Sequence, residues 1–202
     1  MFNKIKNWLF HEDLKKQNLA AFIMLVGSGL GLLASFVLSI EALELAKNSH
    51  AVLSCDFSSA LSCSAVANHW LAAILGFPNS FIGVMTLPVM VTIAVALLAG
   101  AKFPKWFMQA AQAGAIIGMI FAIWMFYMSY VEIGVLCPWC LTLDLGMLMI
   151  MFGLTRYNVL QKNISCRYMQ KIVGGGYDAL VVVSLVVAVI VAIIAKFGSQ
   201  LF

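Results

Sequence analysis

The chain has 202 residues, of which 63% are apolar and only 10% are charged, and its mean hydropathy is +1.01. This composition excludes an ordinary water-soluble protein, because most of the surface of such a chain must face lipid. The formal net charge of +4 is small and gives no reason to expect a nucleic-acid partner. The predicted surroundings are therefore the lipid bilayer.

Five apolar stretches reach or approach the roughly 20 residues that cross a hydrocarbon core about 30 Å thick. We predict transmembrane helices over residues 19–40, 81–101, 108–130, 137–155 and 179–197. The first stretch is too long for the apolar part of a signal peptide and has no small-residue cleavage site after it, so we expect it to be retained. The expected fold class is an all-α membrane protein, with residues 1–202 forming a single membrane domain.

The positive charges predict the orientation of the chain, because short cytoplasmic loops retain Lys and Arg residues. Lys47 and Lys196 would lie on one side of the membrane. The other ten positive residues would lie on the opposite side: Lys4, Lys6, Lys15, Lys16, Lys102, Lys105, Arg156, Lys162, Arg167 and Lys171. We therefore expect a cytoplasmic N-terminus over residues 1–18, a C-terminus outside, and an outer loop over residues 41–80.

The five cysteines divide between the two sides of the membrane. Cys166 falls in a basic cytoplasmic loop, where reducing conditions keep a thiol free, so we expect it to be inert. The other four lie on the outer side, where disulfides form and persist. They make two pairs, Cys55 with Cys63 and Cys137 with Cys140.

The outer loop that carries the first cysteine pair is long, nearly uncharged and rich in Ser and Ala. Residues 66–75 are apolar enough for a short helix in the membrane interface, with Trp70 at headgroup depth. A long loop without regular structure is more often functional than idle. We expect this loop to carry Cys55 and Cys63 between an outside partner and Cys137.

The second cysteine pair opens the fourth predicted span with a Pro and a Trp between the two cysteines. Two intervening residues at a helix start hold the sulfurs close enough to bond or to exchange. Pro138 suits the first helical turn, and the unpaired N–H groups there favour a thiolate, the nucleophile of disulfide exchange. Two structural alternatives remain open, a zinc site shared with the first pair and two static disulfides. The seven residues between Cys55 and Cys63 disfavour zinc, and we favour redox chemistry.

Three motifs in this order resemble the vitamin K epoxide reductase family, in particular its bacterial disulfide-forming members. The first is the pair Cys55 and Cys63 with its seven-residue spacing. The second is Gly-Phe-Pro-Asn at residues 76–79, which enters the second span, and the third is Leu-Cys-Pro-Trp-Cys at residues 136–140. The resemblance covers residues 53–143 in the expected order and topology.

The resemblance implies a four-helix transmembrane bundle around a quinone, plus a fifth transmembrane helix. It implies that Cys55 and Cys63 accept electrons from a thioredoxin-like protein and pass them to the active-site pair Cys137 and Cys140. Cys63 would exchange with Cys137, and Cys140 would face the quinone ring. Asn79 matches a position that hydrogen-bonds the quinone head group in relatives, although its place before a span would also suit a helix N-cap.

The implied enzyme is a membrane disulfide-forming oxidoreductase whose electron acceptor is a quinone of the menaquinone, ubiquinone or phylloquinone type. No thioredoxin-like domain follows the fifth span, so we expect the partner to be a separate extracytoplasmic protein. The expected location is the plasma membrane, with the active site on the extracytoplasmic side. Reduction of a quinone epoxide, as in vertebrate relatives, is the alternative activity.

Asp144 is the only acidic residue within the predicted spans, and an acid at helix centre costs about 2.5 to 3.5 kcal/mol on insertion scales. It follows Cys140 by one helical turn on the same face. We interpret it as a proton carrier or a hydrogen-bonding partner of the quinone; a neutral acid bonded within the bundle is the structural alternative. Vertebrate relatives have a tyrosine at this position, and relatives commonly have a serine in place of His69.

Overall fold

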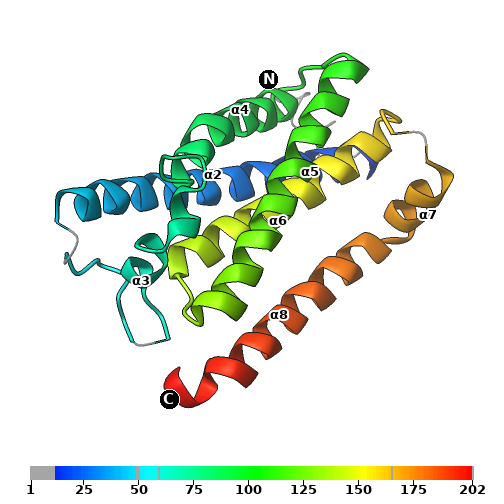
Figure 1. Ribbon diagram of the computed structural model, residues 1–202. Coiled ribbons are helices and arrows are strands. Elements are labelled where there is room, and N and C mark those ends of the chain that lie inside the picture. Colours follow the sequence, from blue (N-terminus) through cyan, green and yellow to red (C-terminus); the bar gives the residue numbers. More distant parts are fainter. Residues whose placement is uncertain (1–11, 49–50, 59, 165, 202) are drawn as a thin grey trace.

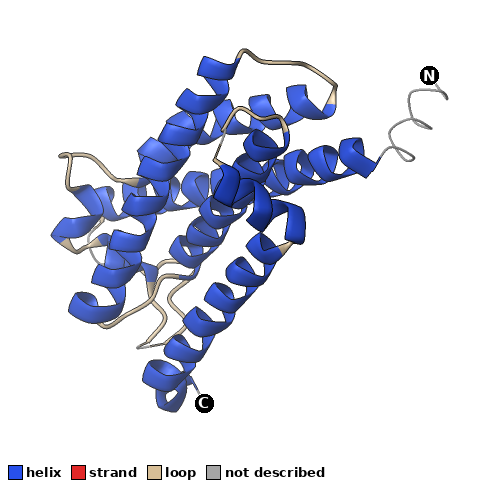
Figure 2. Cartoon of the chain, turned by 90° about the vertical axis from the view of Figure 1, so that its right-hand side faces the viewer, coloured by secondary structure: helices blue, strands red, loops and turns tan. Residues whose placement is uncertain are grey.

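The computed structural model describes residues 12–48, 51–58, 60–164 and 166–201, and its regular elements are helices (Figure 1). The long helices are α2 (Glu12–Lys47), α4 (Ser80–Leu98), α5 (Lys105–Met128), α6 (Pro138–Leu160) and α8 (Tyr177–Leu201). The short ones are α3 (Cys63–Ala67), η1 (Trp70–Ala73), the π-helix η2 (Ser129–Ile133) and α7 (Arg167–Gly175). Figure 2 draws no strand in the described ranges, so the predicted all-α fold class is confirmed.

Five of the described helices are long and apolar enough to cross a membrane. They cover Leu14–Lys47, Ser80–Leu98, Lys105–Ile133, Pro138–Leu160 and Tyr177–Gly198. The chain is therefore a multi-pass membrane protein, as its composition predicts. The expectations for residues 1–11, including Lys4 and Lys6, fall outside the described residues.

The helices end at different residues from those expected from hydropathy. Helix α2 continues to Lys47, beyond the predicted end at residue 40, and Glu41 is therefore on a helix rather than in a loop. Helix α6 continues to Leu160, and the short helix α7 follows it without having been predicted. A hydropathy window stops at the first polar residues, whereas the hydrogen bonds of a helix continue through them.

Helices α2, α4, α5 and α6 pack together as the bundle, with α2 against α4 and α6 and with α5 against α6. Small residues let α2 approach α6 closely, because a Cβ atom on Gly146 would lie 2.7 Å from the carbonyl oxygen of Gly27. Met24, Ile150 and Leu154 fill the core and have no exposed surface. We refer below to the cysteine end of the bundle, where α6 begins, and to the opposite end, where α6 finishes.

Helix α8 runs along the side of the bundle and makes fewer contacts with it (Figure 1). Near its start, Asp178 forms an ion pair with Arg156 of α6. The Arg156 Nη1 and Asp178 Oδ2 atoms are 3.3 Å apart. Near its end, Phe197 is buried against the cysteine end, and the Tyr130 hydroxyl donates to the carbonyl of Ala192. The face between these two points carries exposed Val, Leu and Ile side chains, as expected of a helix that faces lipid.

The predicted interfacial helix over residues 66–75 is instead two short helices, α3 and η1. The break is at His69, whose extended backbone (φ −80°, ψ 143°) ends the first helix and whose ring Nδ1 accepts the Leu71 N–H at the start of the second. His69 therefore has a local capping role. Trp70 is 70% exposed, as a residue at headgroup depth would be.

Candidate active site

A short backbone bridge joins the outer loop to the start of α6. The Ser62 N–H donates to the Leu136 carbonyl at 3.0 Å, and the Leu136 N–H donates to the Ala60 carbonyl at 2.9 Å. The π-helix η2 and Gly134, which has a φ of 69°, turn the chain so that Leu136 reaches this position. The bridge therefore fixes the segment before Cys63 beside the segment before Cys137.

The two cysteine pairs consequently meet at the cysteine end of the bundle. Cys55 and Cys63 form a disulfide, whereas Cys137 and Cys140 are free thiols. The Sγ atoms of Cys63 and Cys137 are 3.2 Å apart. A thiolate exchanges with a disulfide by direct attack on one of its sulfurs, so Cys137 and Cys63 lie within reach of such an exchange.

The start of α6 places a backbone N–H group against the sulfur of Cys137. Cys137 is the N-cap residue of the helix, and its Sγ accepts the Cys140 N–H at 3.2 Å. Pro138 occupies the first helical turn, as predicted. The hydrogen bond from the Cys140 N–H holds the Cys137 sulfur at the N-terminus of the helix, on the side that faces Cys63.

Glu41 lies directly against the disulfide, although the sequence pattern gave no indication of this. Its side chain is 4% exposed, and both carboxyl oxygens are 3.3 Å from the Sγ of Cys55. The Ser54 hydroxyl donates to Oε1 at 3.0 Å. Hydropathy assigned Glu41 to the outer loop, so only the continuation of α2 to Lys47 brings it to the site.

Asp56 fastens the loop between the two cysteines of the disulfide. Its carboxylate accepts hydrogen bonds from the Leu53 N–H at 2.9 Å, the Ser62 hydroxyl at 2.7 Å and the Ser64 N–H at 3.0 Å. Burial by itself would raise the pKa of Asp56, but these hydrogen bonds outweigh it and lower the pKa to about 2. This residue, too, was absent from the predicted site, because its partners are known only once the loop is folded.

Asn79 is the N-cap residue of α4, at the position predicted, but its side chain forms no capping hydrogen bond. Its Nδ2 group instead donates to the Leu71 carbonyl at 2.6 Å and contacts the Met125 sulfur at 3.8 Å. Its Oδ1 atom is buried and has no hydrogen-bond partner among the residues that the structure describes. A buried carbonyl oxygen without a donor is uncommon and suits a ligand that brings a hydroxyl group.

Asp144 lies on α6 one turn beyond Cys140, and its side chain is partly buried. Within the described part of the chain it forms neither a hydrogen bond nor an ion pair. The structural alternative is a neutral acid bonded within the bundle, and no such bond is found among the described residues. Its carboxyl group remains available to a ligand or to a proton.

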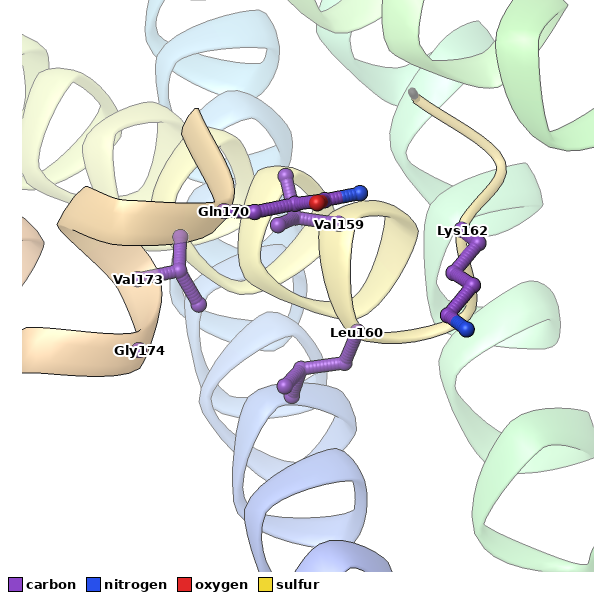
Figure 3. A pocket seen from close by; sticks show the side chains of 6 residues that line it. All are labelled: Val159, Leu160, Lys162, Gln170, Val173 and Gly174. Carbon is purple, nitrogen blue, oxygen red and sulfur yellow. The ribbon is translucent and has the colours of Figure 1, made fainter. Parts of the chain in front are cut away.

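The two cavities best defined in the structure lie away from the cysteines. The larger one, of about 160 Å³, is at the opposite end of the bundle between α6 and α7 (Figure 3), and the second, of about 130 Å³, lies near Lys102 and Tyr157. The first is lined by Val159, Leu160, Lys162, Gln170, Val173 and Gly174. Both are smaller than the roughly 300–1,000 Å³ of typical ligand pockets, and neither contains chemistry that matches a thiol site.

Glu41, Cys55 and Cys63 form a compact group whose potential ligand atoms lie within 4.8 Å of one another. Zinc is bound by thiolates, not by the sulfurs of a disulfide. With Cys55 and Cys63 bonded to each other, the four thiolates of the proposed zinc alternative are not present together. The donor set of this state therefore does not fit a zinc ion.

Comparison with protein families agrees with this geometry. The vitamin K epoxide reductase family matches residues 22–156, a segment that includes both cysteine pairs, Asn79 and Asp144. The chain belongs to the vitamin K epoxide reductase family. Members of this family are oxidoreductases that use quinones as electron partners, either as thiol oxidoreductases or as epoxide reductases. No curated protein matches the chain by sequence.

Proposed function

We propose that this protein is a thiol:quinone oxidoreductase that reoxidises a separate, extracytoplasmic thioredoxin-like partner and so drives disulfide formation. The observation that carries this proposal is the 3.2 Å distance between the Sγ atoms of Cys63 and Cys137. It joins a disulfide to a thiol of the second pair, which is the contact that a relay between the pairs needs.

The relay begins when a partner thiolate attacks the Sγ of Cys55 and Cys63 leaves as a thiolate. Cys63 then attacks Cys137 in the oxidised Cys137–Cys140 pair, and Cys140 leaves as a thiolate. The second thiol of the partner displaces Cys55, and Cys55 attacks Cys63 to close its disulfide and release Cys137. The partner leaves oxidised, and its two electrons reside on Cys137 and Cys140. The observed disulfide and free thiols correspond to this state.

Three residues at the cysteine end of the bundle would fit a quinone head group: Cys140 and Asp144 on α6, and Asn79 before α4. When bound, a quinone supplies an acceptor for two electrons and two protons. Cys140 would pass on the electrons, since it is the last sulfur of the relay. The unpartnered Oδ1 of Asn79 would accept a hydroxyl of the reduced ring, and Asp144 would hold a proton for it. The acceptor would be of the menaquinone, ubiquinone or phylloquinone type.

The distribution of charge supports an extracytoplasmic site in the plasma membrane. Lys102, Lys105 and Lys162 lie at the opposite end of the bundle from the cysteines, next to the ends of α4, α5 and α6. Cytoplasmic loops retain such residues. The cysteine end would then face the oxidising compartment, where a disulfide persists.

Purified full-length protein, assayed with reduced thioredoxin and ubiquinone-1, tests the proposal. We expect quinone reduction that depends on thioredoxin and yields one oxidised thioredoxin per quinone. A thioredoxin that lacks its second active-site cysteine should attack the Cys55–Cys63 disulfide and remain attached to Cys55 as a mixed disulfide, detected by mass spectrometry. Turnover of a quinone epoxide without thioredoxin-linked quinone reduction would contradict the proposal and support the epoxide reductase alternative.

A further inference from the structure

Glu41 is a buried acid that the relay described above leaves without a role. Both of its carboxyl oxygens contact the Sγ of Cys55, and Ser54 donates to one of them. A disulfide sulfur carries no hydrogen, so in the observed state a hydrogen bond between Glu41 and Cys55 needs a proton on the carboxyl group. In the reduced state the Cys55 thiol supplies that proton instead.

The charges around Glu41 favour a carboxyl group that exchanges a proton. The charged groups that interact with it are Asp56 from the loop and Glu44 from α2, both acidic, and on α6 it interacts with the thiol of Cys140. No Lys, Arg or His side chain forms an ion pair with Glu41 in the described ranges. A buried carboxylate without a cationic partner is unfavourable, whereas a neutral acid with a hydrogen bond is not.

The relay creates a proton-transfer problem at Cys55. Each time the partner is displaced, Cys55 leaves as a thiolate at a position only 2% exposed, where water has little access. Each time the disulfide closes again, Cys55 must lose a proton before it can attack. Glu41 is the acid in contact with this sulfur.

We propose that Glu41 is the proton carrier of Cys55, an inference that rests on the proposed thiol:quinone activity. When the partner leaves oxidised, the sulfur–sulfur bond to Cys55 breaks and the Glu41 carboxyl gives its proton to the Cys55 thiolate. When Cys55 attacks the mixed disulfide between Cys63 and Cys137, its proton returns to Glu41, a new Cys55–Cys63 bond forms, and Cys137 leaves as a thiolate. Glu41 is unchanged over the cycle, so protons and electrons balance.

Charge-neutral substitution of Glu41 tests this role. Glu41→Gln keeps the shape and the acceptor for Ser54 but cannot exchange a proton, and general acid–base catalysis contributes about 10²- to 10⁴-fold. We expect kcat with reduced thioredoxin and ubiquinone-1 to fall by about 10² or more. The matched control is Glu132→Gln, an exposed acid on η2 that is not among the charged groups that interact with Glu41, and it should stay within about twofold of the unchanged protein.

Two further measurements separate a proton carrier from a structural acid. The first turnover of ubiquinone-1 by a protein already reduced at Cys137 and Cys140 does not use Cys55, so Glu41→Gln should leave it unchanged while later turnovers slow. Glu41→Asp restores an acid and should recover activity with a displaced pH profile. Full turnover in Glu41→Gln, or equal loss in both phases, would overturn the inference. If Glu41→Gln does not fold, an unchanged pH profile in Glu41→Asp overturns the proton-carrier role. An inactive unmodified protein would instead refute the proposed thiol:quinone activity.

Discussion

Two asparagines, one at each end of the bundle, differ in how their buried polar atoms are hydrogen-bonded. At the opposite end from the cysteines, Asn158 is fully buried and hydrogen-bonded: it donates to Gln112 at 3.1 Å and accepts from Asn163 at 3.0 Å. At the cysteine end, Asn79 keeps a buried oxygen without a partner, and Asp144 has none within the described part of the chain. A satisfied network holds helices together, whereas unsatisfied polar groups at membrane depth are what the proposed quinone site requires.

Cys140→Ala, at the cysteine end, should have the largest effect on activity. In the proposed relay Cys140 is the sulfur that passes electrons to the quinone, so quinone reduction should be abolished while the protein still inserts and unfolds as before. The measurement is thioredoxin-dependent reduction of ubiquinone-1, with thermal unfolding in detergent as the control. Unchanged electron transfer would show that Cys140 has a different role.

Asn158→Leu should instead damage stability at the other end. It removes three side-chain hydrogen bonds, with the Met108 carbonyl, Gln112 and Asn163. The buried Gln112 oxygen is left without this donor, a loss of about 1–3 kcal/mol. Thermal or denaturant unfolding should record a clear decrease, and kcat at low temperature should be kept. If activity fell with no loss of stability, the distinction between the two ends would be wrong.

Asn79→Ala is the corresponding change at the cysteine end. It removes the free oxygen that we assign to the quinone, and the loss of about 1 kcal/mol of binding should raise KM for ubiquinone-1 by roughly five- to tenfold. The unfolding temperature should change less than in Asn158→Leu. A stability loss with an unchanged KM would make Asn79 a structural residue.

A smaller effect is expected from Asp56, whose hydrogen bonds favour the ionised carboxylate. Since its pKa is about 2 in the folded loop and 3.8 in a free chain, its contribution is present above about pH 4 and is lost as the pH falls towards 2. Reduction of the Cys55–Cys63 disulfide by a phosphine should therefore accelerate over that interval. In the Asp56→Asn variant the phosphine should reduce this disulfide several-fold faster already at pH 7. Equal reduction rates in the variant and the unchanged protein would show that Asp56 does not fasten the loop.

The smallest effect is expected from Cys166→Ser. Cys166 is exposed at the start of α7, at the end of the bundle away from the other cysteines. Its replacement should leave both kcat and the unfolding temperature unchanged within error. A large loss of activity would mean that the proposed relay has omitted a sulfur.

The sequence was sufficient for features that depend on local patterns. Hydropathy predicts the five apolar helices, and spacing predicts that Cys137 begins a helix beside Cys140. It was insufficient for Glu41 and Asp56, because their roles depend on where α2 ends and on which loop atoms surround a carboxyl group. In the sequence, Glu41 is only an acid that follows an apolar span, and Asp56 is only an acid next to a cysteine. Neither pattern by itself indicates a functional site.

The near-complete burial of the disulfide limits which thiols can reach its sulfur atoms. Cys55 and Cys63 are 2% and 1% exposed, so a small diffusing thiol such as glutathione meets loop atoms before it meets sulfur. In the proposed relay, a protein partner would reach Cys55 only by binding the loop and displacing it. Burial would therefore keep abundant small thiols from reducing the disulfide and, through it, the lipid-soluble electron acceptor.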